Sequence, residues 1–185
     1  MKTFLFCLSF LTLFGISDAA FAQDDAPKFD GSFQLGVLRL EESVGEAPLG
    51  VGGRFGYRFS SRFFLDGEAM HFPEDPSGNF GETLVLGGIR YGKQFDKVGI
   101  YAKARAGAIH FGGSSFNWRL SEKSFPVFDV GAMLEFYPKE HFFIRLDLGD
   151  CIIPFGGAVF QGLNGPVTLE TRHTLAMGFG FGFRF

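Results

Sequence analysis

The sequence predicts an all-β fold, an eight-stranded antiparallel up-and-down barrel whose strands cross a membrane. Three observations support this fold class. Segments of about ten residues alternate between apolar positions and positions held by polar residues or glycine, which is typical of membrane strands. The links between these segments alternate between short and long, as they do when turns lie on one rim of a barrel and loops on the other. The chain also carries 27 phenylalanines and 27 glycines among 185 residues, which favours β-structure with close backbone approaches.

The first 22 residues have the three parts of an export signal. Lys2 precedes an apolar run from Phe4 to Ile16, and the segment closes with the small residues Ala20 and Ala22. This order is typical of a cleavable signal peptide. The apolar run is also shorter than the roughly 20 residues that a transmembrane helix needs. We therefore expect residues 1–22 to be removed and residues 23–185 to form one barrel domain.

Cysteine content, charge and hydropathy exclude several classes of protein. Cys7 would leave with the signal peptide, so Cys151 would remain alone and no disulfide could form within the mature chain. The first mature residue would be Gln23, where a lipoprotein has cysteine, which argues against a lipid anchor. The net charge of −3 comes without a basic cluster, so we expect no nucleic-acid partner. After residue 22 no apolar run is long enough for a membrane helix, which excludes a helical membrane protein.

Eight segments show the two-residue alternation. The seventh is typical, because Phe142, Ile144 and Leu146 alternate with Arg145 and Asp147. The predicted strands are residues 29–40, 49–59, 63–72, 83–93, 98–111, 127–137, 142–149 and 171–185. Short turns are expected near residues 60–61, 94–97 and 138–141, and long loops at residues 41–48, 73–82, 112–126 and 150–170.

Alternation alone does not say which face of the strands points outward, because a secreted lipocalin-like barrel has the same period with its apolar face inside. Two observations favour an apolar exterior. The residues in phase with the charges are mostly glycines, which suits the narrow lumen of eight strands. The polar face also carries both signs of charge, which can pair when buried, although a solvated outer face is the alternative. The predicted lumen charge network comprises Arg54, Arg58, Asp66, Glu68, Arg90, Lys103, Arg105, Asp129, Glu135, Arg145, Asp147 and Arg172.

The final strand carries a further pattern. Large apolar residues occupy every second position up to the last residue, and four of them are Phe179, Phe181, Phe183 and Phe185. This pattern resembles the C-terminal signature by which the barrel-assembly machinery recognises bacterial outer-membrane barrels. With the signal peptide and the alternating segments, the chain resembles the small OmpA-like and OmpX-like barrels of the porin-family type. The peptidoglycan-binding domain of full-length OmpA-type proteins has no counterpart in this sequence.

This resemblance implies a place in the bacterial outer membrane. Its expected partners are outer-membrane lipid, lipopolysaccharide and the barrel-assembly machinery, with the four phenylalanines of the last strand as the assembly signal. We expect the barrel to be a monomer, and we expect no cofactor.

Small barrels include outer-membrane enzymes, so the histidines were considered as catalytic residues. His71, His110 and His173 fall on the apolar phase of their strands, which places them toward lipid or headgroups, and His141 falls in a short turn. Lipid A deacylases on small barrels use a serine, a histidine and an acid near one rim, and His173 has no neighbouring serine. We therefore expect no catalytic residue, no metal ligand and no enzymatic activity.

The remaining candidates for function are aromatic residues in the two longest loops. Phe116, Trp118, Phe125, Phe155 and Phe160 could contact lipopolysaccharide, another protein or a host surface, or could form the aromatic belt at the membrane interface. We expect a structural or interaction role, namely membrane integrity with loop-mediated adhesion, around a lumen that is largely plugged by charged residues. A narrow pore or a carrier of small hydrophobic molecules is the first alternative, and a lipid A-modifying enzyme is the second.

Overall fold

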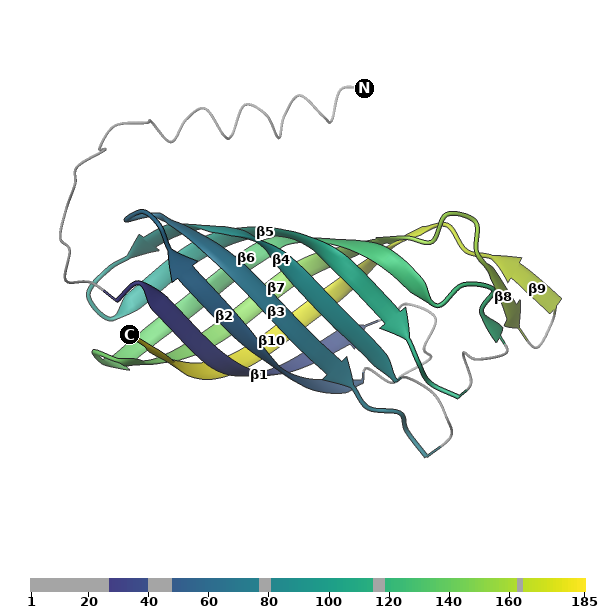
Figure 1. Cartoon of the computed structure of the whole chain (residues 1–185), viewed down its shortest axis with the longest axis horizontal. Helices are drawn as coiled ribbons and strands as arrows, with labels where there is room; N and C mark the ends of the chain where they lie inside the picture. Colours follow the sequence, from purple (N-terminus) through teal and green to yellow (C-terminus); the bar gives the residue numbers. More distant parts are fainter. Residues whose placement is uncertain (1–26, 40–47, 77–80, 115–118, 163–164) are drawn as a thin grey trace, which may run out of the picture.

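Eight strands form one closed antiparallel barrel in which neighbours in the chain are neighbours in space (Figure 1). A computed structural model describes residues 27–39, 48–76, 81–114, 119–162 and 165–185. The predicted fold class is confirmed. The barrel strands are β1 (Phe29–Arg39), β2 (Leu49–Arg58), β3 (Phe63–Phe72), β4 (Glu82–Gln94), β5 (Val98–Phe111), β6 (Ser124–Lys139), β7 (Phe142–Pro154) and β10 (Thr171–Arg184).

A second, smaller sheet lies beyond the long-loop rim of the barrel. It is a hairpin of β8 (Val159–Gly162) and β9 (Gly165–Thr168) inside the loop between β7 and β10. This hairpin was not predicted from the sequence. The predicted signal peptide and the loop aromatics Phe116 and Trp118 lie outside the described residues.

The predicted strands match the observed ones most closely where the two faces differ most in polarity. The third and fifth strands begin and end where predicted. Strand β7 is longer than predicted and continues through Cys151, Ile152 and Ile153. This run has no alternation because Cys151 and Ile153 are buried in an apolar part of the lumen. The period that predicts a half-buried strand is lost where both faces are apolar.

Pairing between the first and last strands closes the barrel. The amide of Phe29 donates to the carbonyl of Phe185, and the amide of Phe185 donates to the carbonyl of Phe29, both at 2.9 Å. The register then runs from Asp30 opposite Arg184 to Arg39 opposite Leu175. Closure leaves no barrel strand with an unpaired edge, which is the condition for placing β-structure in hydrocarbon.

The exterior of the barrel is apolar, as predicted. Large apolar side chains at alternate positions are exposed along all eight strands, among them Phe33, Phe55, Val85, Ile100, Leu134, Leu148, Phe179, Phe181 and Phe183. In water such a surface would drive aggregation, whereas hydrocarbon accepts it. Among the described residues, no helix is long and apolar enough to cross a membrane.

Replacing Leu146 by arginine tests this exterior. Leu146 is 52% exposed and lies in β7 beside the outward-facing Leu134 and Phe179. We expect Leu146→Arg to lower the free energy of unfolding in lipid vesicles by about 2–4 kcal/mol, because the charge would lie near the middle of the hydrocarbon. The matched control is Phe95→Arg, since Phe95 is 54% exposed but lies in a short turn. Equal losses for the two variants in urea titrations would contradict a lipid-facing Leu146.

Candidate functional site

The lumen is the candidate functional site, and its side chains form three levels along the barrel axis. Nearest the short turns is a turn-side ion cluster of Asp30, Arg90, Glu135 and Arg145. The central ion cluster above it contains Arg54, Asp66, Glu68, Lys103, Arg105, Asp129 and Asp147. Toward the long loops lies an apolar cap, whose residues are given below.

The turn-side ion cluster joins four strands of the barrel. Arg90 Nη1 donates to Glu135 Oε1 at 2.7 Å, and Arg145 Nε donates to the same oxygen at 2.7 Å. Asp30 accepts from Arg145 Nη2 at 3.1 Å and also from Arg90. The two acids and two bases are all buried and balance in charge. Such complete pairing is what allows charges to be held away from water.

Aromatic rings support the two arginines of this cluster from the turn side. The guanidinium of Arg90 lies 4.3 Å from the ring centre of Phe64, and that of Arg145 lies 4.8 Å from the ring centre of Phe143. Desolvated contacts of this kind add attraction between the cation and the ring face. The Tyr137 hydroxyl donates to Glu135 as well. Each guanidinium is therefore positioned by acids on one side and by a ring on another.

The central ion cluster is denser and has one more acid than bases. Arg54 Nε donates to Glu68 Oε2 at 2.6 Å, and Arg54 Nη2 lies 2.8 Å from Asp147 Oδ2. Arg105 Nη2 lies 2.7 Å from Asp129 Oδ2 and Arg105 Nη1 lies 3.1 Å from Glu68 Oε2. Residues on β2, β3, β5, β6 and β7 are thereby connected across the lumen. A set of shared partners of this kind acts as a network and not as separate pairs.

Lys103 completes the central ion cluster and depends on glycines for its space. Its Nζ lies 2.9 Å from Asp129 Oδ2 and also pairs with Asp147. A Cβ at Gly149 would lie 2.8 Å from that Nζ and 2.4 Å from Asp129 Oδ1. In the turn-side cluster, a Cβ at Gly56 would lie 2.7 Å from an Arg90 nitrogen. The glycines in phase with the charges therefore provide the room that the ion pairs occupy.

The long-loop end of the lumen is apolar, which was not predicted from the sequence. The buried strand residues at this end share the strand phase of the charges, so they point inward. We name this set the apolar cap: Leu38, Met70, Phe72, Leu84, Leu86, Ile109, Phe111, Leu120, Phe125, Val127, Cys151, Ile153, Phe155, Ala158 and Leu169.

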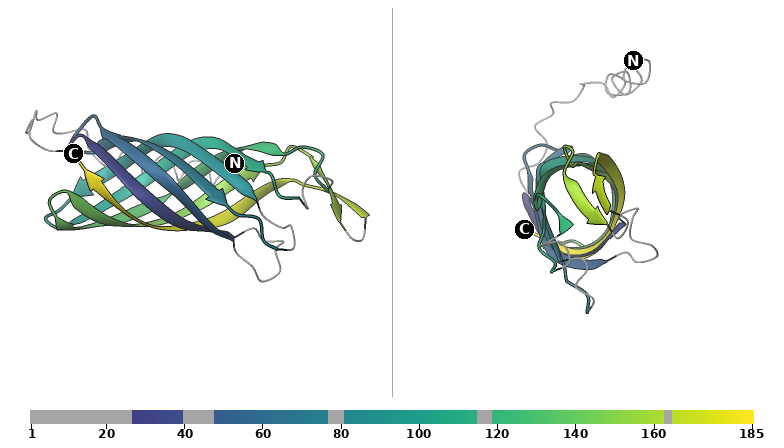
Figure 2. Two further views of the ribbon diagram at one scale, coloured as in Figure 1. Left: turned by 60° about the horizontal axis from the view of Figure 1, so that its bottom comes forward. Right: turned by 90° about the vertical axis from the view of Figure 1, so that its right-hand side faces the viewer.

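Loop residues complete the cap at the outer mouth. Phe155, Ala158 and Leu169 belong to the segment that carries the β8–β9 hairpin, and Leu120 belongs to the loop before β6. Seen along the barrel axis, this hairpin lies in front of the opening (Figure 2). The Phe125 and Phe155 rings meet edge to face, with centres 4.7 Å apart. The loops therefore extend the lumen core beyond the last strand residues.

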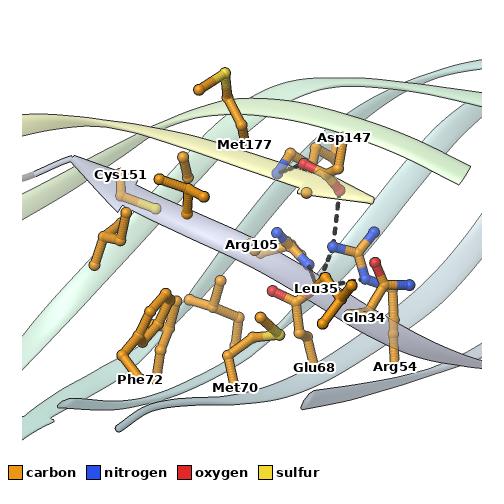
Figure 3. A pocket seen from close by; sticks show the side chains of 18 residues that line it. Gln34, Leu35, Arg54, Glu68, Met70, Phe72, Arg105, Asp147, Cys151 and Met177 are labelled. Carbon is orange, nitrogen blue, oxygen red and sulfur yellow. Dashed lines mark hydrogen bonds and ion pairs between the residues drawn. The ribbon is translucent and has the colours of Figure 1, made fainter. Parts of the chain in front are cut away.

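A small cavity marks the boundary between the cap and the central ion cluster. Its volume is about 40 Å³, and its lining changes from Phe72, Met70 and Cys151 to Arg105 and Glu68 (Figure 3). A space of this size holds a few water molecules. This cavity is therefore too small for a larger ligand.

The structure brings ten of the twelve predicted lumen charges into these two clusters. Arg58 lies half-buried at the turn end of β2, and Arg172 lies half-buried near the loop end of β10, both apart from the two clusters. The sequence analysis omitted Asp30, although its position in phase with Ser32 and Gln34 places it on the inner face. This alternation is the sequence feature by which Asp30 can be identified as a lumen residue.

The histidines of the strands lie on the exterior, at the long-loop end. His71, Thr83, His110 and Ser124 are successive cross-strand neighbours on β3, β4, β5 and β6. His71 Nδ1 lies 3.1 Å from Thr83 Oγ1, and His110 Nδ1 lies 2.9 Å from Ser124 Oγ. We name these four exposed residues the outer polar row. On each of these four strands, the outward-facing apolar residues lie on the turn side of this row.

The His110–Ser124 contact joins two residue types of a hydrolase site, and the sequence analysis did not foresee it. A catalytic serine also needs a group that orients the histidine and donors for the oxyanion. The described contacts of this pair show neither. His173 Nδ1 bonds instead to Asp150 at 2.7 Å, in an exposed pair on β10 and β7. Among the described residues, no three His, Cys, Asp or Glu side chains gather as metal ligands would.

Comparisons with known proteins identify the fold. No protein-family model and no curated protein matches the chain. The N-terminal β-barrel domain of Pseudomonas aeruginosa OprF has a TM-score of 0.56 and 16% identity, over 84% of this chain and 97% of that one. Neisserial surface protein A has a TM-score of 0.56 and 15% identity, over 85% and 97%. Outer membrane protein H of P. aeruginosa has a TM-score of 0.50 and 12% identity, over 84% and 99%. The fold is that of the small outer-membrane barrels.

Asp129→Asn tests whether the central ion cluster stabilises the barrel. Asp129 is fully buried and contacts both Lys103 and Arg105. We expect a loss of about 3–5 kcal/mol in the free energy of unfolding, because the buried cations of Lys103 and Arg105 would both lose a carboxylate in direct contact. Asp96→Asn, in an exposed turn, is the control and should change the free energy by less than about 0.5 kcal/mol. Similar small effects of both substitutions in vesicle refolding would contradict a stabilising network.

Proposed function

We propose that this protein is a non-conducting barrel of the bacterial outer membrane, with a role in membrane integrity and surface interaction. The observation that carries the proposal is the filling of the lumen by three levels in series. An ion crossing the barrel would have to displace the turn-side ion cluster, the central ion cluster and the apolar cap in turn. This arrangement also opposes the alternative of a narrow pore.

The exterior supports placement in the outer membrane. The apolar band suits hydrocarbon, and the fold is similar to that of proteins of the outer membrane. Lipopolysaccharide and other phosphate-bearing lipids are the proposed neighbours of the outer polar row, since imidazole and hydroxyl groups can donate to phosphate oxygens. The alternating phenylalanines Phe179, Phe181, Phe183 and Phe185 are the proposed recognition segment for the barrel-assembly machinery.

Adhesion is proposed for the region beyond the outer rim. The β8–β9 hairpin projects past the ends of the barrel strands (Figure 1). Val167 of this hairpin is 46% exposed, whereas Phe155 and Phe160 pack at or against the apolar cap. The hairpin, more than the aromatic rings, is therefore the surface offered to a partner. A loop that projects from a rigid barrel is suited to contact with other surfaces.

The two remaining alternatives have weaker support. A carrier of hydrophobic molecules would need space inside the apolar cap, and the described cavity is only about 40 Å³. A lipid A-modifying enzyme has one observation in its favour, the contact between His110 and Ser124. Loss of an acyl chain from lipid A in cells that express the protein, abolished by Ser124→Ala, would replace the structural proposal with this enzyme. Unchanged lipid A is the result that we expect.

Planar-bilayer recording tests the proposed closure of the lumen. We expect protein that is folded by gel mobility to give no steady single-channel steps under either polarity, because the three levels leave no continuous aqueous path. A porin reconstituted in the same way should conduct and serves as the control. Regular conductance steps from the wild-type barrel would overturn the proposal of a closed lumen.

A further inference from the structure

One carboxyl group lies inside the apolar cap. Glu82 is the first residue of β4, it points inward, and its exposed fraction is 0%. Its Cα partners on the neighbouring strands are Phe72 on β3 and Phe111 on β5, both members of the cap. The next residue, Thr83, belongs to the outer polar row, so Glu82 lies beyond the lipid-facing band.

Among the described residues, no other residue donates a hydrogen bond to the carboxyl group of Glu82, and none of the ion pairs includes it. Apolar side chains separate it from the charges deeper in the lumen. The nearest of these charges along β3, β4 and β5 are Glu68, Arg90 and Arg105. In the described parts of the loops around the rim, the charged residues are Glu74, Asp75, Arg119, Glu122, Lys123 and Glu170.

An isolated carboxylate is strongly disfavoured in such surroundings. Burial without a counter-charge favours the neutral acid, and it raises the pKa of Glu82 to about 7. A glutamate in water has a pKa of about 4.3. The closed cap therefore binds a proton that an open, hydrated cap would release.

In the described residues, the loop part of the cap is held by separate hydrogen bonds and not by a continuous strand ladder. Leu120 forms an isolated bridge with Phe160, the amide of Ser121 donates to the carbonyl of Val159 at 3.1 Å, and the amide of Val159 donates to Ser121 Oγ at 3.0 Å. The amide of Leu169 donates to the carbonyl of Ala158 at 2.7 Å, and the amide of Gly157 donates to the carbonyl of Leu169 at 3.1 Å. The barrel below is fixed by continuous strand pairing, so the loop segments are the part that opens at least cost.

We propose that Glu82 is a proton-operated latch of the apolar cap, which keeps the outer mouth closed when protonated and loosens it when ionised. Opening would expose the apolar upper lumen to the medium while the two ion clusters below stay closed. The latch is a property beyond the proposed structural role, and a closed lumen in bilayer recordings is compatible with it.

The direction of the pH dependence follows from the raised pKa. Below about pH 4.3 the carboxyl is protonated in both states, so it does not disfavour closure. As the pH rises toward 7, the open state ionises first and closure becomes progressively less favourable. Above about pH 7 the effect is complete. The shift corresponds to a change on the order of 100-fold in the ratio of open to closed caps.

Cys151 provides a probe for cap opening. It is the single cysteine of residues 23–185, it is 1% exposed, and it lies at the base of the cap. The experiment measures the rate of N-ethylmaleimide labelling of the mature protein in detergent at pH 5 and at pH 8.5. At each pH the wild type is compared with Glu82→Gln, so that the intrinsic pH dependence of the thiol cancels. Glu170→Gln removes an exposed carboxyl of the cap loop and is the control.

With a pKa of about 7 in the closed cap and about 4.3 in the open one, the latch predicts that at pH 5 the wild type labels only about sixfold faster than Glu82→Gln. At pH 8.5 the wild type and Glu170→Gln should label on the order of 100-fold faster than Glu82→Gln. Equal rates at both pH values, or faster labelling of Glu82→Gln at pH 8.5, would overturn the proposal. Gel mobility verifies folding, and Glu82→Met replaces Glu82→Gln in the comparison if the glutamine variant does not fold.

Discussion

The lumen of an eight-stranded barrel is only just wide enough for the side chains of its own strands, and the interior of this protein follows from that constraint. Inward positions must be filled, yet every charge placed there must meet an opposite charge. Arg145 satisfies both demands, since it is fully buried, bonds to Glu135 and Asp30, and lies against the Phe143 ring. Gly56 and Gly149 have no side chain, and they leave the space that the charged side chains beside them occupy.

Two different ways of filling the lumen divide the barrel. The ion clusters cross-link strands that are not neighbours in the sheet, as Arg54 does when it reaches Asp147. The apolar cap instead resembles the core of a water-soluble protein and recruits loop residues such as Phe155. Glu82 is the exception within the cap, and this is why its protonation state can bear on cap stability.

Much of the fold could be predicted from the sequence, because membrane strands with contrasting faces have a clear two-residue period. The period fails at Cys151, Ile152 and Ile153, where both faces of β7 are apolar. The two-residue alternation also identified most of the charged residues in the lumen, but it does not indicate which of them form ion pairs with each other. The acid missing from the predicted network, Asp30, meets Arg90 and Arg145 across sequence separations of 60 and 115 residues. Such contacts are fixed by barrel closure and not by local pattern.

The central claim is that paired charges hold the lumen closed as a connected network. A double-mutant cycle between Glu135 and Arg145 tests it most directly, using Glu135→Gln, Arg145→Met and the double variant in vesicle unfolding experiments. The account predicts a coupling free energy above about 1 kcal/mol, with the double variant less destabilised than the sum of the single variants. Additivity within about 0.5 kcal/mol would show that the two residues are independent and would contradict the claim.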